Sequence, residues 1–595
     1  MKTECGLIGA FINNPISKKD LWNTLAEIQH RGQDSYGFVS IHSNGVSKIK
    51  KEKGLLPDLD SLDLPDVSGG VSVEDKDVGA DGASTNGTRK GDAVLFLGHM
   101  RYSTNTSVEK LDESLTDCNI QPVEISEQYG IYLAHNGNLP NMRENMQKLG
   151  LGQYYKNGMS DTYLFRVIWN VKFAGRFNSG GGKTCKIEDV LEYLKYIILN
   201  VVGAYSCVMT FCESRGDSNT TARTSVSSIG SDTSGGAYSD SSDSDDSDNG
   251  PRYYLIGFRD RYGYKPLSIG KLVDDVSSSS KLVNHCFFSE SVQLQDNKNN
   301  KHFIGDVGPG EIWCSIMNKA PRLIGRISDS GKKRLIGNNI NVASGNGDSN
   351  LTGFLCSLEA IYFMKKESVL FNGETTVNNF RRRLGIELAK QDIHNYACAL
   401  NPNDMNPSEY EARQLLKRRV ILYMPESSYS IAQGYAEMLD TWTRGDLITK
   451  VQNIRSFIEN STEAREGKLK RKFAFDDAGI AALGDSEIIL VDDTIVRGNS
   501  MRYVIGELYK RNPALKIHVR IGSPRLLKGC SFGIDLYDDE LIATKEDNLA
   551  GWLGIASVEF LELSKLKEIF ARYGMLNCQY CFGVNHKYNQ KTLEW

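Results

Sequence analysis

Two aspartates follow a short apolar segment in the second half of the chain. Ile488 to Val491 form an unbroken apolar run, which indicates a strand buried on both faces in a parallel sheet. After Asp492 and Asp493 come a polar loop and then apolar residues at helical spacing, so the pattern predicts strand, loop and helix. Backbone N–H groups at such a helix start stabilise a phosphate, and the carboxylates can accept hydrogen bonds from ribose hydroxyls. From the spacing alone, an ordinary strand end with a solvated acid pair is an equally good interpretation.

The segment from Glu487 to Lys510 closely resembles the phosphoribosylpyrophosphate (PRPP) signature of phosphoribosyltransferases, and its VDDTIVRG form resembles the glutamine PRPP amidotransferase family. The resemblance implies that seven loop residues bind PRPP: Asp492, Asp493, Thr494, Arg497, Gly498, Asn499 and Ser500. Pro425-Glu426-Ser427 is similar to the family's P-D-S turn, which contacts pyrophosphate and metal in that family. Glu426 and Ser427 therefore join the predicted site, with a longer carboxylate arm at Glu426.

Residues 453–473 resemble the mobile loop of the same family. Arg455, Arg465 and Lys472 fall on matched basic positions, whereas Ser456 and Glu459 replace the family's Thr and Gln. A solvated basic run is the alternative interpretation. The functional interpretation is favoured because departing pyrophosphate is highly charged, and cationic closure stabilises it.

Cys5 begins an apolar segment, where a cysteine is more often a small buried hydrophobe than a nucleophile. Five motifs reverse that expectation, because CGLIGAF, QHRGQDSYG, GHMRYST, LAHNGNL and SDTYLF follow the order of class II glutamine amidotransferases. The resemblance implies that Cys5 attacks the glutamine amide and that its own α-amino group is the base. An α-amine titrates near ambient pH, unlike a lysine side chain.

The same resemblance implies an oxyanion hole made by Asn136 and Gly137, through a side-chain amide and a backbone N–H. Four residues are implied to bind glutamine: Arg31, Gly32, Arg101 and Asp161. Arg101 would hold the carboxylate by a bidentate fork, and Asp161 the ammonium group by charge. Taken alone, Arg101 also fits a structural ion pair and HNGN a simple turn.

Residues 1–4 precede the nucleophile, so a working N-terminal cysteine requires their removal. Some members of the family carry such a propeptide, with an acid before the cysteine as Glu4 is here. The sequence therefore predicts a propeptide of four residues.

At 595 residues and 66.2 kDa the chain is too long for one core. The resemblance implies an α/β plus α+β organisation with two domains. Residues 5–327 would form an N-terminal-nucleophile glutaminase domain of four layers, αββα, and residues 351–595 a type I phosphoribosyltransferase α/β domain with a parallel sheet. Residues 328–350 are the predicted linker. Segments at about 58–92 and 214–250 are rich in Gly, Ser and Asp, which predicts disordered insertions.

Composition excludes several functional classes. A net charge of −4 and a pI near 6.2 give no nucleic-acid footprint, and no segment is long enough to span a membrane. The amino-terminal sequence lacks the apolar region of a signal peptide, so a cytoplasmic protein is expected. Twelve cysteines in a reducing compartment favour catalysis or metal binding over disulfides.

Cys578 and Cys581 form a C-x-x-C pair, which fits half of a zinc site, a redox pair or chance. Cys356 and Cys530 fall where the cluster-bearing branch of the family has two further ligands, and that branch also carries a propeptide. The resemblance thus implies a structural [4Fe–4S] cluster on these four thiolates, with tetrahedral Zn²⁺ as the main alternative. Mg²⁺ is expected to arrive with PRPP and to bind near three acids: Asp492, Asp493 and Glu426.

Together, the resemblances imply a transferase that makes 5-phosphoribosylamine from glutamine and PRPP, the first committed step of de novo purine synthesis. Ammonia freed at Cys5 would pass to the PRPP site. Implied partners are purine nucleotides as feedback inhibitors and further copies of the chain in a dimer or tetramer. One alternative is a catalytically impaired PRPP- or nucleotide-sensing homologue, which Glu426, Ser456 and Glu459 favour. Another class II amidotransferase is the second alternative, but the sequence lacks a sugar-isomerase domain and an ATP-binding loop.

Overall fold

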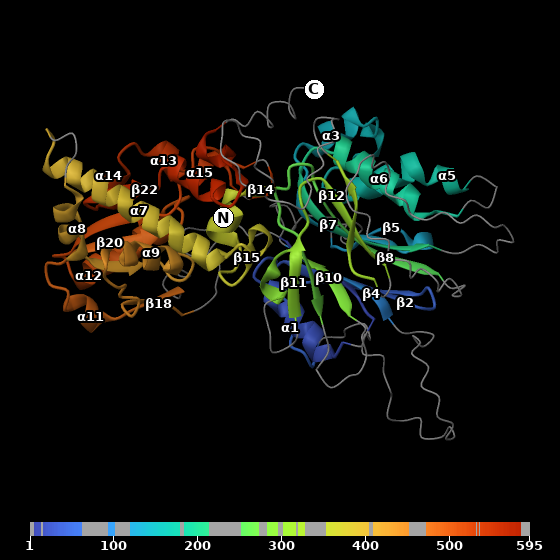
Figure 1. Cartoon of the computed structure of the whole chain (residues 1–595), viewed down its shortest axis with the longest axis horizontal. Coiled ribbons are helices and arrows are strands. Elements are labelled where there is room, and N and C mark those ends of the chain that lie inside the picture. Colours follow the sequence, from blue (N-terminus) through green and yellow to red (C-terminus); the bar gives the residue numbers. More distant parts are fainter. Residues whose placement is uncertain are drawn as a thin grey trace, which may run out of the picture. The chain divides into compact units, whose positions relative to one another are not determined.

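The computed structural model describes residues 5–13, 16–61, 93–101, 120–178, 184–213, 251–272, 283–294, 301–316, 319–327, 353–403, 408–451, 472–530, 532–534 and 536–584. The chain forms two compact units that divide between Leu335 and Ile336. In Figure 1 the first unit runs from blue to light green and the second from yellow to red.

The amino-terminal unit contains two antiparallel sheets, and the first has the strand order β11-β9-β10-β1-β4-β2-β3. Its strands are β1 (Gly6–Phe11), β2 (Ser35–His42), β3 (Ser47–Lys53), β4 (Ala93–Arg101), β9 (Ser268–Leu272), β10 (Asn284–Phe288) and β11 (Lys301–Asp306). Every residue of β1 and β2 is buried, because the sheet is covered on both faces. The edge strand β3 instead carries several lysines, which oppose the addition of another strand.

The second sheet has the order β13-β12-β8-β7-β6-β5. Its strands are β5 (Val123–Ser126), β6 (Ile131–Asn138), β7 (Ala204–Glu213), β8 (Arg252–Arg259), β12 (Glu311–Ile316) and β13 (Arg322–Arg326). One apolar cluster joins Leu7 and Leu97 of the first sheet to Val208 and Leu255 of the second. The two sheets therefore pack face to face, so closely that a Cβ at Gly9 would lie 2.4 Å from Val208 Cγ1.

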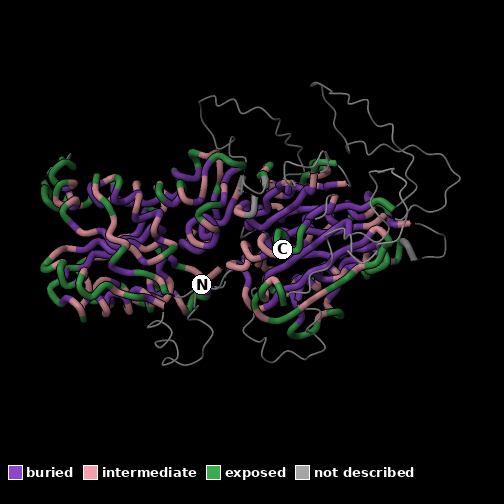
Figure 2. Tube along the Cα trace, turned by 90° about the horizontal axis from the view of Figure 1, so that it is seen from below, coloured by how far each residue is buried: buried purple, intermediate pink, exposed green. Residues whose placement is uncertain are grey.

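Helices cover the outer face of each sheet. On the first sheet α1 (Lys18–Ile28) buries Leu21, Leu25 and Ile28, and the side chain of its N-cap, Ser17, accepts a hydrogen bond from the Asp20 N–H. The second sheet is covered by α3 (Met142–Lys148), α4 (Tyr163–Ile168), η5 (Trp169–Phe173), α5 (Gly175–Asn178) and α6 (Ile187–Asn200). Three short turns complete the unit: η3 (Glu127–Tyr129), η4 (Gly152–Tyr154) and η6 (Ser291–Leu294). The predicted four-layer arrangement is confirmed, and Figure 2 shows its buried interior in purple.

The second unit is built on a parallel sheet of order β17-β20-β21-β22. Its strands are β17 (Val420–Tyr423), β20 (Glu487–Asp492), β21 (Lys516–Ile521) and β22 (Ser557–Phe560). In β20, Ile489 and Val491 pack on the side of α7 (Val377–Leu400) and α9 (Tyr429–Leu439), while Ile488 and Leu490 face α12 (Asn499–Arg511). The prediction of a doubly covered strand followed by a loop and a helix is confirmed.

Shorter elements surround this sheet. The helices are α8 (Glu409–Lys417), α11 (Asp477–Ala481), α13 (Ile542–Lys545), α14 (Leu549–Leu553), α15 (Leu563–Ala571), η8 (Glu359–Phe363), η9 (Phe371–Gly373), η10 (Asp538–Glu540) and η11 (Tyr580–Phe582). The strand pairs are β14 (Gly353–Cys356) with β23 (Met575–Cys578), β15 (Val369–Leu370) with β16 (Thr375–Thr376), and β18 (Ile448–Lys450) with β19 (Phe473–Phe475).

Two glycines let α7 and α9 cross at very short range. A Cβ at Gly385 would lie 1.8 Å from the Ile431 carbonyl oxygen, and one at Gly434 would lie 1.8 Å from the Arg382 carbonyl oxygen. Because α9 follows the turn at 425–428, this crossing fixes where that turn lies at the sheet edge.

Several predicted features lie outside the described residues. They are the propeptide at 1–4, residues 62–92 of the first insertion, the second insertion at 214–250, the linker at 328–350, and Arg455 with its loop. No helix in the described ranges is long and apolar enough to cross a membrane.

Candidate functional site

Cys5 lies immediately before β1, the strand that pairs with both β10 and β4. Its carbonyl oxygen accepts a hydrogen bond from Arg31 Nε at 3.1 Å. Arg31 is 1% exposed, and its Nη1 donates to Glu290 Oε1 at 2.7 Å. The bonds described for Arg31 thus reach the backbone of Cys5, the predicted nucleophile, and a buried acid. Its predicted contact with glutamine stays a prediction.

Gly32 brings the loop after α1 against the end of β4. A Cβ at Gly32 would lie 2.3 Å from the Met100 carbonyl oxygen, and the Asp34 N–H donates to the Arg101 carbonyl oxygen at 3.0 Å. Met100 is the register partner of Gly6, the residue after Cys5. The structure therefore brings the loop of Arg31 and Gly32 and the strand end of Arg101 beside the start of β1.

Asn136, in β6, is 1% exposed, yet neither its Oδ1 nor its Nδ2 has a hydrogen-bond partner among the described residues. Leaving a buried polar group unpaired costs about 1–3 kcal/mol, so such a group indicates a site that a ligand completes. Gly137 follows with φ 148°, and a Cβ there would lie 1.9 Å from the Ala204 carbonyl oxygen. Only glycine fits this position. A free amide followed by an obligatory glycine suits an oxyanion hole.

A buried network supports the same end of β6. The Gln121 side chain accepts from the His135 N–H at 2.6 Å and donates to the Thr162 hydroxyl at 3.0 Å, and His135 Nδ1 lies 3.1 Å from that hydroxyl. The Asp161 carboxylate accepts from the Leu139 N–H at 3.0 Å. Asp161, the predicted partner of the glutamine ammonium group, is thus held beside the oxyanion residues.

His99 connects the two sheets at this point. It lies in β4, where it is the register partner of Leu7 of β1, and its Nε2 donates to the carbonyl oxygen of His135 in β6 at 3.1 Å. Burial, helped by the charge of Arg101, lowers the pKa of His99 to about 3, and burial also lowers the pKa of His135. Both rings are therefore neutral near pH 7. β4 pairs with β1, the strand that follows Cys5. The His99 hydrogen bond joins β4 to β6, the strand that carries Asn136.

The predicted PRPP residues gather at one edge of the parallel sheet. Because β17 and β20 are parallel neighbours, their carboxyl ends meet, and ligands bind at such edges. The first strand leads into the turn of Glu426 and Ser427, the second into Asp492, Asp493 and Thr494. Asp493 is 1% exposed, accepts from the Thr494 hydroxyl at 2.9 Å and is also hydrogen-bonded by Ser427. The two segments that the sequence predicted separately form one site.

Ionising both carboxylates of this pair is costly. Burial, followed by repulsion from Asp493, raises the pKa of Asp492 well above its usual value, and Lys472 offsets this in part. Burial also raises the pKa of Asp493, against the hydrogen bonds of Ser427 and Thr494. A cation or the hydroxyl donors of a ribose would stabilise this charge. In the described ranges no group of three or more His, Cys, Asp or Glu side chains surrounds a single ion, so the acid pair and Glu426 do not form a complete metal cage.

Gly498 turns the loop into α12. It caps the helix with φ 73°, and a Cβ there would lie 2.8 Å from the Trp552 ring. Asn499 and Ser500 are the first residues of this 13-residue helix, where unpaired N–H groups and the helix dipole favour a phosphate.

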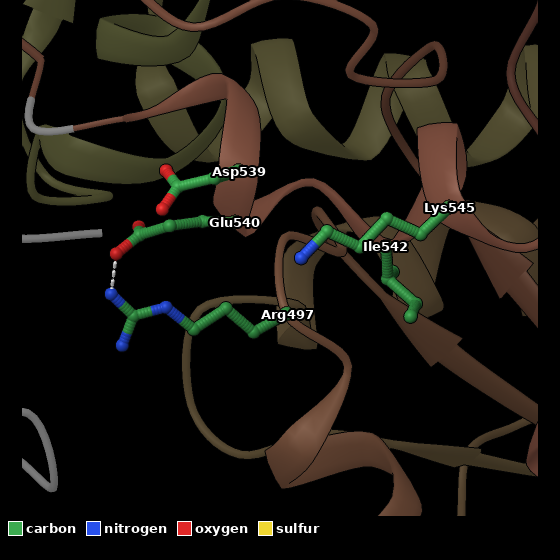
Figure 3. A pocket seen from close by; sticks show the side chains of 5 residues that line it. All are labelled: Arg497, Asp539, Glu540, Ile542 and Lys545. Carbon is green, nitrogen blue, oxygen red and sulfur yellow. Dashed lines mark hydrogen bonds and ion pairs between the residues drawn. The ribbon is translucent and has the colours of Figure 1, made fainter.

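Arg497 contacts a different part of the unit from the other loop residues. Its guanidinium forms an ion pair with Glu540 of η10, and both residues line a pocket of about 330 Å³ with Asp539, Ile542 and Lys545, as Figure 3 shows. The pocket is lined by two acids and two bases, and the Arg497 guanidinium is paired with one of the acids. The predicted role of Arg497 in PRPP binding stays a prediction.

Basic groups stand near the acid edge. Glu426 is largely exposed, and its carboxylate lies 3.9 Å from Lys450 Nζ. Lys472 immediately precedes β19 and is close enough to lower the pKa of Asp492. Arg455 lies outside the described residues.

Four cysteines of the second unit are neighbours. Cys356 and Cys578 are register partners in the parallel pair of β14 and β23. Burial raises the pKa of Cys581, and the nearby thiols of Cys578, Cys356 and Cys530 raise it further. The Cys581 carbonyl oxygen accepts from the Leu527 N–H at 2.7 Å, which draws the segment before Cys530 to the C-x-x-C turn.

The donor set fits a cluster of soft metal ions. Cys356, Cys578 and Cys581 are at most 7% exposed and Cys530 is partly buried, so three of the four thiols lie in a largely dry environment. Tetrahedral zinc draws all of its sulfurs to about 2.3 Å from one ion, whereas each thiolate of a four-iron cluster binds a different iron and stands farther from the others. The [4Fe–4S] cluster on these four thiolates stays a prediction.

Sequence reasoning missed several residues of the amino-terminal site. They are Gln121, His99, His135, Thr162, Ser289 and Glu290. Glu290 and Arg31 are 259 positions apart, and no local pattern connects them. His99, His135 and Thr162 lie within the quoted motifs GHMRYST, LAHNGNL and SDTYLF, but only tertiary contacts show that they support other residues.

The fold defines a two-unit chain, in which a unit of two face-to-face antiparallel sheets covered by helices precedes a unit built on a parallel sheet between helices. The solved structure of glutamine PRPP amidotransferase from Bacillus subtilis, complexed with ADP and GMP, matches with a TM-score of 0.61 at 21% identity over 98% of this chain and 97% of that one. A structure described as the allosteric regulatory enzyme of purine biosynthesis matches with a TM-score of 0.62 at 22% identity over 98% and 96%. The predicted fold class is confirmed.

Curated relatives agree over almost the whole chain. Amidophosphoribosyltransferases of Methanocaldococcus jannaschii, Escherichia coli K12 and Bacillus subtilis 168 are 24%, 23% and 25% identical. The alignments cover 96%, 94% and 98% of this chain and 94%, 88% and 93% of the relatives. No family model matches the sequence. The chain is thus similar over almost its whole length to amidophosphoribosyltransferases, as its motifs predicted.

Proposed function

We propose that this protein is an amidophosphoribosyltransferase that converts glutamine, PRPP and water into 5-phosphoribosylamine, glutamate and pyrophosphate. The observation that carries the proposal is the buried amide of Asn136, which has no hydrogen-bond partner among the described residues. Its strand, β6, is joined by the His99 hydrogen bond to β4, which pairs with β1 next to Cys5. The acid pair at the sheet edge of the second unit supplies the other half of the reaction.

In the glutaminase half, the Cys5 sulfur attacks the amide carbon of glutamine. The negative charge that develops on the amide oxygen is stabilised by Asn136 Nδ2 and the Gly137 N–H. The α-amine of Cys5, free once residues 1–4 are removed, takes the thiol proton and returns it to the departing ammonia. Water then hydrolyses the thioester to give glutamate and restore the thiol.

In the transferase half, ammonia attacks the anomeric carbon of PRPP and pyrophosphate leaves. The Asp492 and Asp493 carboxylates accept hydrogen bonds from the ribose hydroxyls, and the start of α12 holds the 5-phosphate. Lys472 and Arg455 offset the charge of the departing pyrophosphate. Mg²⁺ carried by PRPP would bind beside Asp492, Asp493 and Glu426 and neutralise part of that charge.

Further parts of the proposal concern maturation, cofactors and setting. Residues 1–4 are a propeptide whose removal exposes Cys5. Cys356, Cys530, Cys578 and Cys581 hold a [4Fe–4S] cluster with a structural role. The enzyme works in the cytoplasm as a dimer or tetramer, and purine nucleotides inhibit it. ADP and GMP in the Bacillus subtilis structure support the last point.

The experiment that tests the function uses purified, matured protein with PRPP, Mg²⁺ and glutamine labelled with ¹⁵N in the side-chain amide. Labelled phosphoribosylamine, equimolar with glutamate and pyrophosphate, is the expected result. Tight PRPP binding without turnover would instead identify a sensing homologue. Glutamate release without any use of PRPP would identify a different amidotransferase.

A further inference from the structure

Glu290 is a fully buried carboxylate in the amino-terminal unit, with an exposed fraction of 0%. It lies between β10 and η6 and contacts two side chains on the loop after α1. Arg31 Nη1 and His30 Nε2 both lie 2.7 Å from its Oε1. Burial by itself raises the pKa of Glu290, but His30 and Arg31 lower it below its usual value, so the acid is ionised. A buried ionised carboxylate is costly unless it is paired, so its retention requires a structural or catalytic reason.

The position of Glu290 is tied to the nucleophile through the backbone. Ser289, the residue before it, donates its N–H to the Leu7 carbonyl oxygen at 3.2 Å and accepts from the Leu7 N–H through its hydroxyl at 2.5 Å. Leu7 is two residues beyond Cys5. The acid is therefore held at a fixed place relative to the first residues of β1.

Arg31 completes the connection by donating from Nε to the Cys5 carbonyl oxygen at 3.1 Å. In a matured chain no peptide bond precedes Cys5, so its orientation depends on the peptide that follows it. Both the nucleophilic sulfur and the α-amine are attached to the Cys5 Cα. A bond that fixes the Cys5 carbonyl consequently sets the direction of both groups.

We infer that Glu290 is a positioning residue of the glutaminase reaction, which orients Cys5 through the Arg31 guanidinium. His30 assists by sharing the same carboxylate oxygen, and its Nδ1 is held 2.9 Å from the Glu27 carbonyl oxygen at the end of α1. This inference rests on the proposed function, because it assigns a role within the same site.

The consequence for kinetics is specific. Glutamine is held through Arg101 and Asp161 in the proposed site, so loss of Glu290 should leave KM for glutamine nearly unchanged. Misalignment of the sulfur and the amine should lower kcat by about 10- to 100-fold, because small displacements of reacting groups have effects of this size. A residue that only stabilised the fold would change neither constant of the folded protein.

The test compares Glu290→Gln, Glu290→Asp and Glu311→Gln in matured protein. Glu311 is a matched control because it is also buried and also pairs with an arginine, Arg326, but lies in β12 of the other sheet. Glutamate release at varied glutamine gives kcat and KM, ammonia-dependent synthesis reports the second unit, and the melting temperature reports folding.

The expected result is a 10- to 100-fold lower kcat in Glu290→Gln with KM within about threefold, an intermediate kcat in Glu290→Asp, and wild-type constants in Glu311→Gln. Ammonia-dependent synthesis should be equal in all variants. Equal kcat in wild type and Glu290→Gln, or an equal loss in Glu311→Gln, would overturn the inference. If Glu290→Gln does not fold, Glu290→Asp decides by the same comparison. A wild-type protein that releases no glutamate would contradict the proposed function itself.

Discussion

Asn136 and His99 show how single residues prepare the amino-terminal site. The Asn136 amide is buried without a partner, so the free site already carries a cost of about 1–3 kcal/mol that an oxyanion can offset. His99 Nδ1 is also unpartnered among the described residues, and burial keeps the ring neutral. In the proposed oxyanion hole, the neutral Asn136 amide would stabilise charge only as it forms, and substrate binding would gain little from it.

Replacement of Cys5 by alanine should abolish glutamine-dependent synthesis of phosphoribosylamine. Ammonia-dependent synthesis should remain, because the PRPP residues belong to the other unit. Initial rates with each nitrogen source measure the effect. Cys398→Ser, which changes an exposed cysteine, is the control and should leave both rates unchanged. Parallel loss of both activities in the Cys5 variant would contradict two separate sites.

His99 should make the protein sensitive to acid in a defined pH range. Its folded pKa of about 3 lies below the unfolded value near 6.5, so the unfolded chain binds a proton that the folded chain does not. The stability from the neutral ring is complete above pH 6.5 and falls, as pH decreases towards 3, by about 1.4 kcal/mol per pH unit. The melting temperature between pH 4 and 6.5 should therefore depend less on pH in His99→Gln than in wild type. An unchanged slope would show that His99 is not neutral and buried in solution.

Elements decide how much of each site was predictable from sequence. The strand from Ile488 to Val491 and the helix after Gly498 were predicted correctly, because apolar periodicity and a loop signature are local properties. The meeting of the Glu426 turn with Asp493 follows from the parallel pairing of β17 and β20, whereas the sequence predicted only that the sheet is parallel. Glu290 was missed, because only tertiary packing brings it to Arg31.

Asp492→Asn should weaken PRPP use with either nitrogen source. It removes one charged acceptor at the carboxyl end of β20, at a cost of about 1–3 kcal/mol in PRPP binding. PRPP saturation curves with ammonia and with glutamine measure this change. Asp440→Asn is the matched control, since Asp440 is exposed, pairs with Lys417, and has a left-handed φ of 57° that asparagine tolerates. Wild-type PRPP kinetics in the Asp492 variant would remove this aspartate from the site.

Gly385→Ala should destabilise the second unit by more than about 2 kcal/mol, because its new Cβ would lie 1.8 Å from backbone at the crossing of α7 and α9. Gly506→Ala in α12 is the control. Nothing lies within 4 Å of a Cβ there, and alanine favours a helix over glycine by about 0.5–1 kcal/mol. Thermal unfolding should therefore move in opposite directions in the two variants. A stable Gly385 variant would mean that the helices do not cross this closely.

In the whole molecule, the predicted glutaminase residues and the predicted PRPP residues belong to different compact units. Within each unit, strands that are far apart in the sequence pair with one another. β1 pairs with β10, which follows it by almost 300 residues, and β14 pairs with β23 near the end of the described chain. Such long-range strand pairs close large loops and are slow to form, so a covalent or metal-centred link between the two strands would stabilise them. Two of the four cysteines, Cys356 and Cys578, are register partners in the pair of β14 and β23.

Cys578→Ser tests whether these cysteines hold a cluster that secures β23. Wild-type protein purified without oxygen should be brown, with iron and acid-labile sulfide near four per chain. The variant should lose colour and iron, and its melting temperature should fall, because Cys578 is the register partner of Cys356 and the cluster would join β14, β23 and the Cys530 segment. Cys314→Ser is a control of equal burial, since Cys314 lies in β12 of the other unit, and it should keep full iron content. Colourless wild-type protein with one zinc per chain, or iron content unchanged in Cys578→Ser, would contradict the cluster.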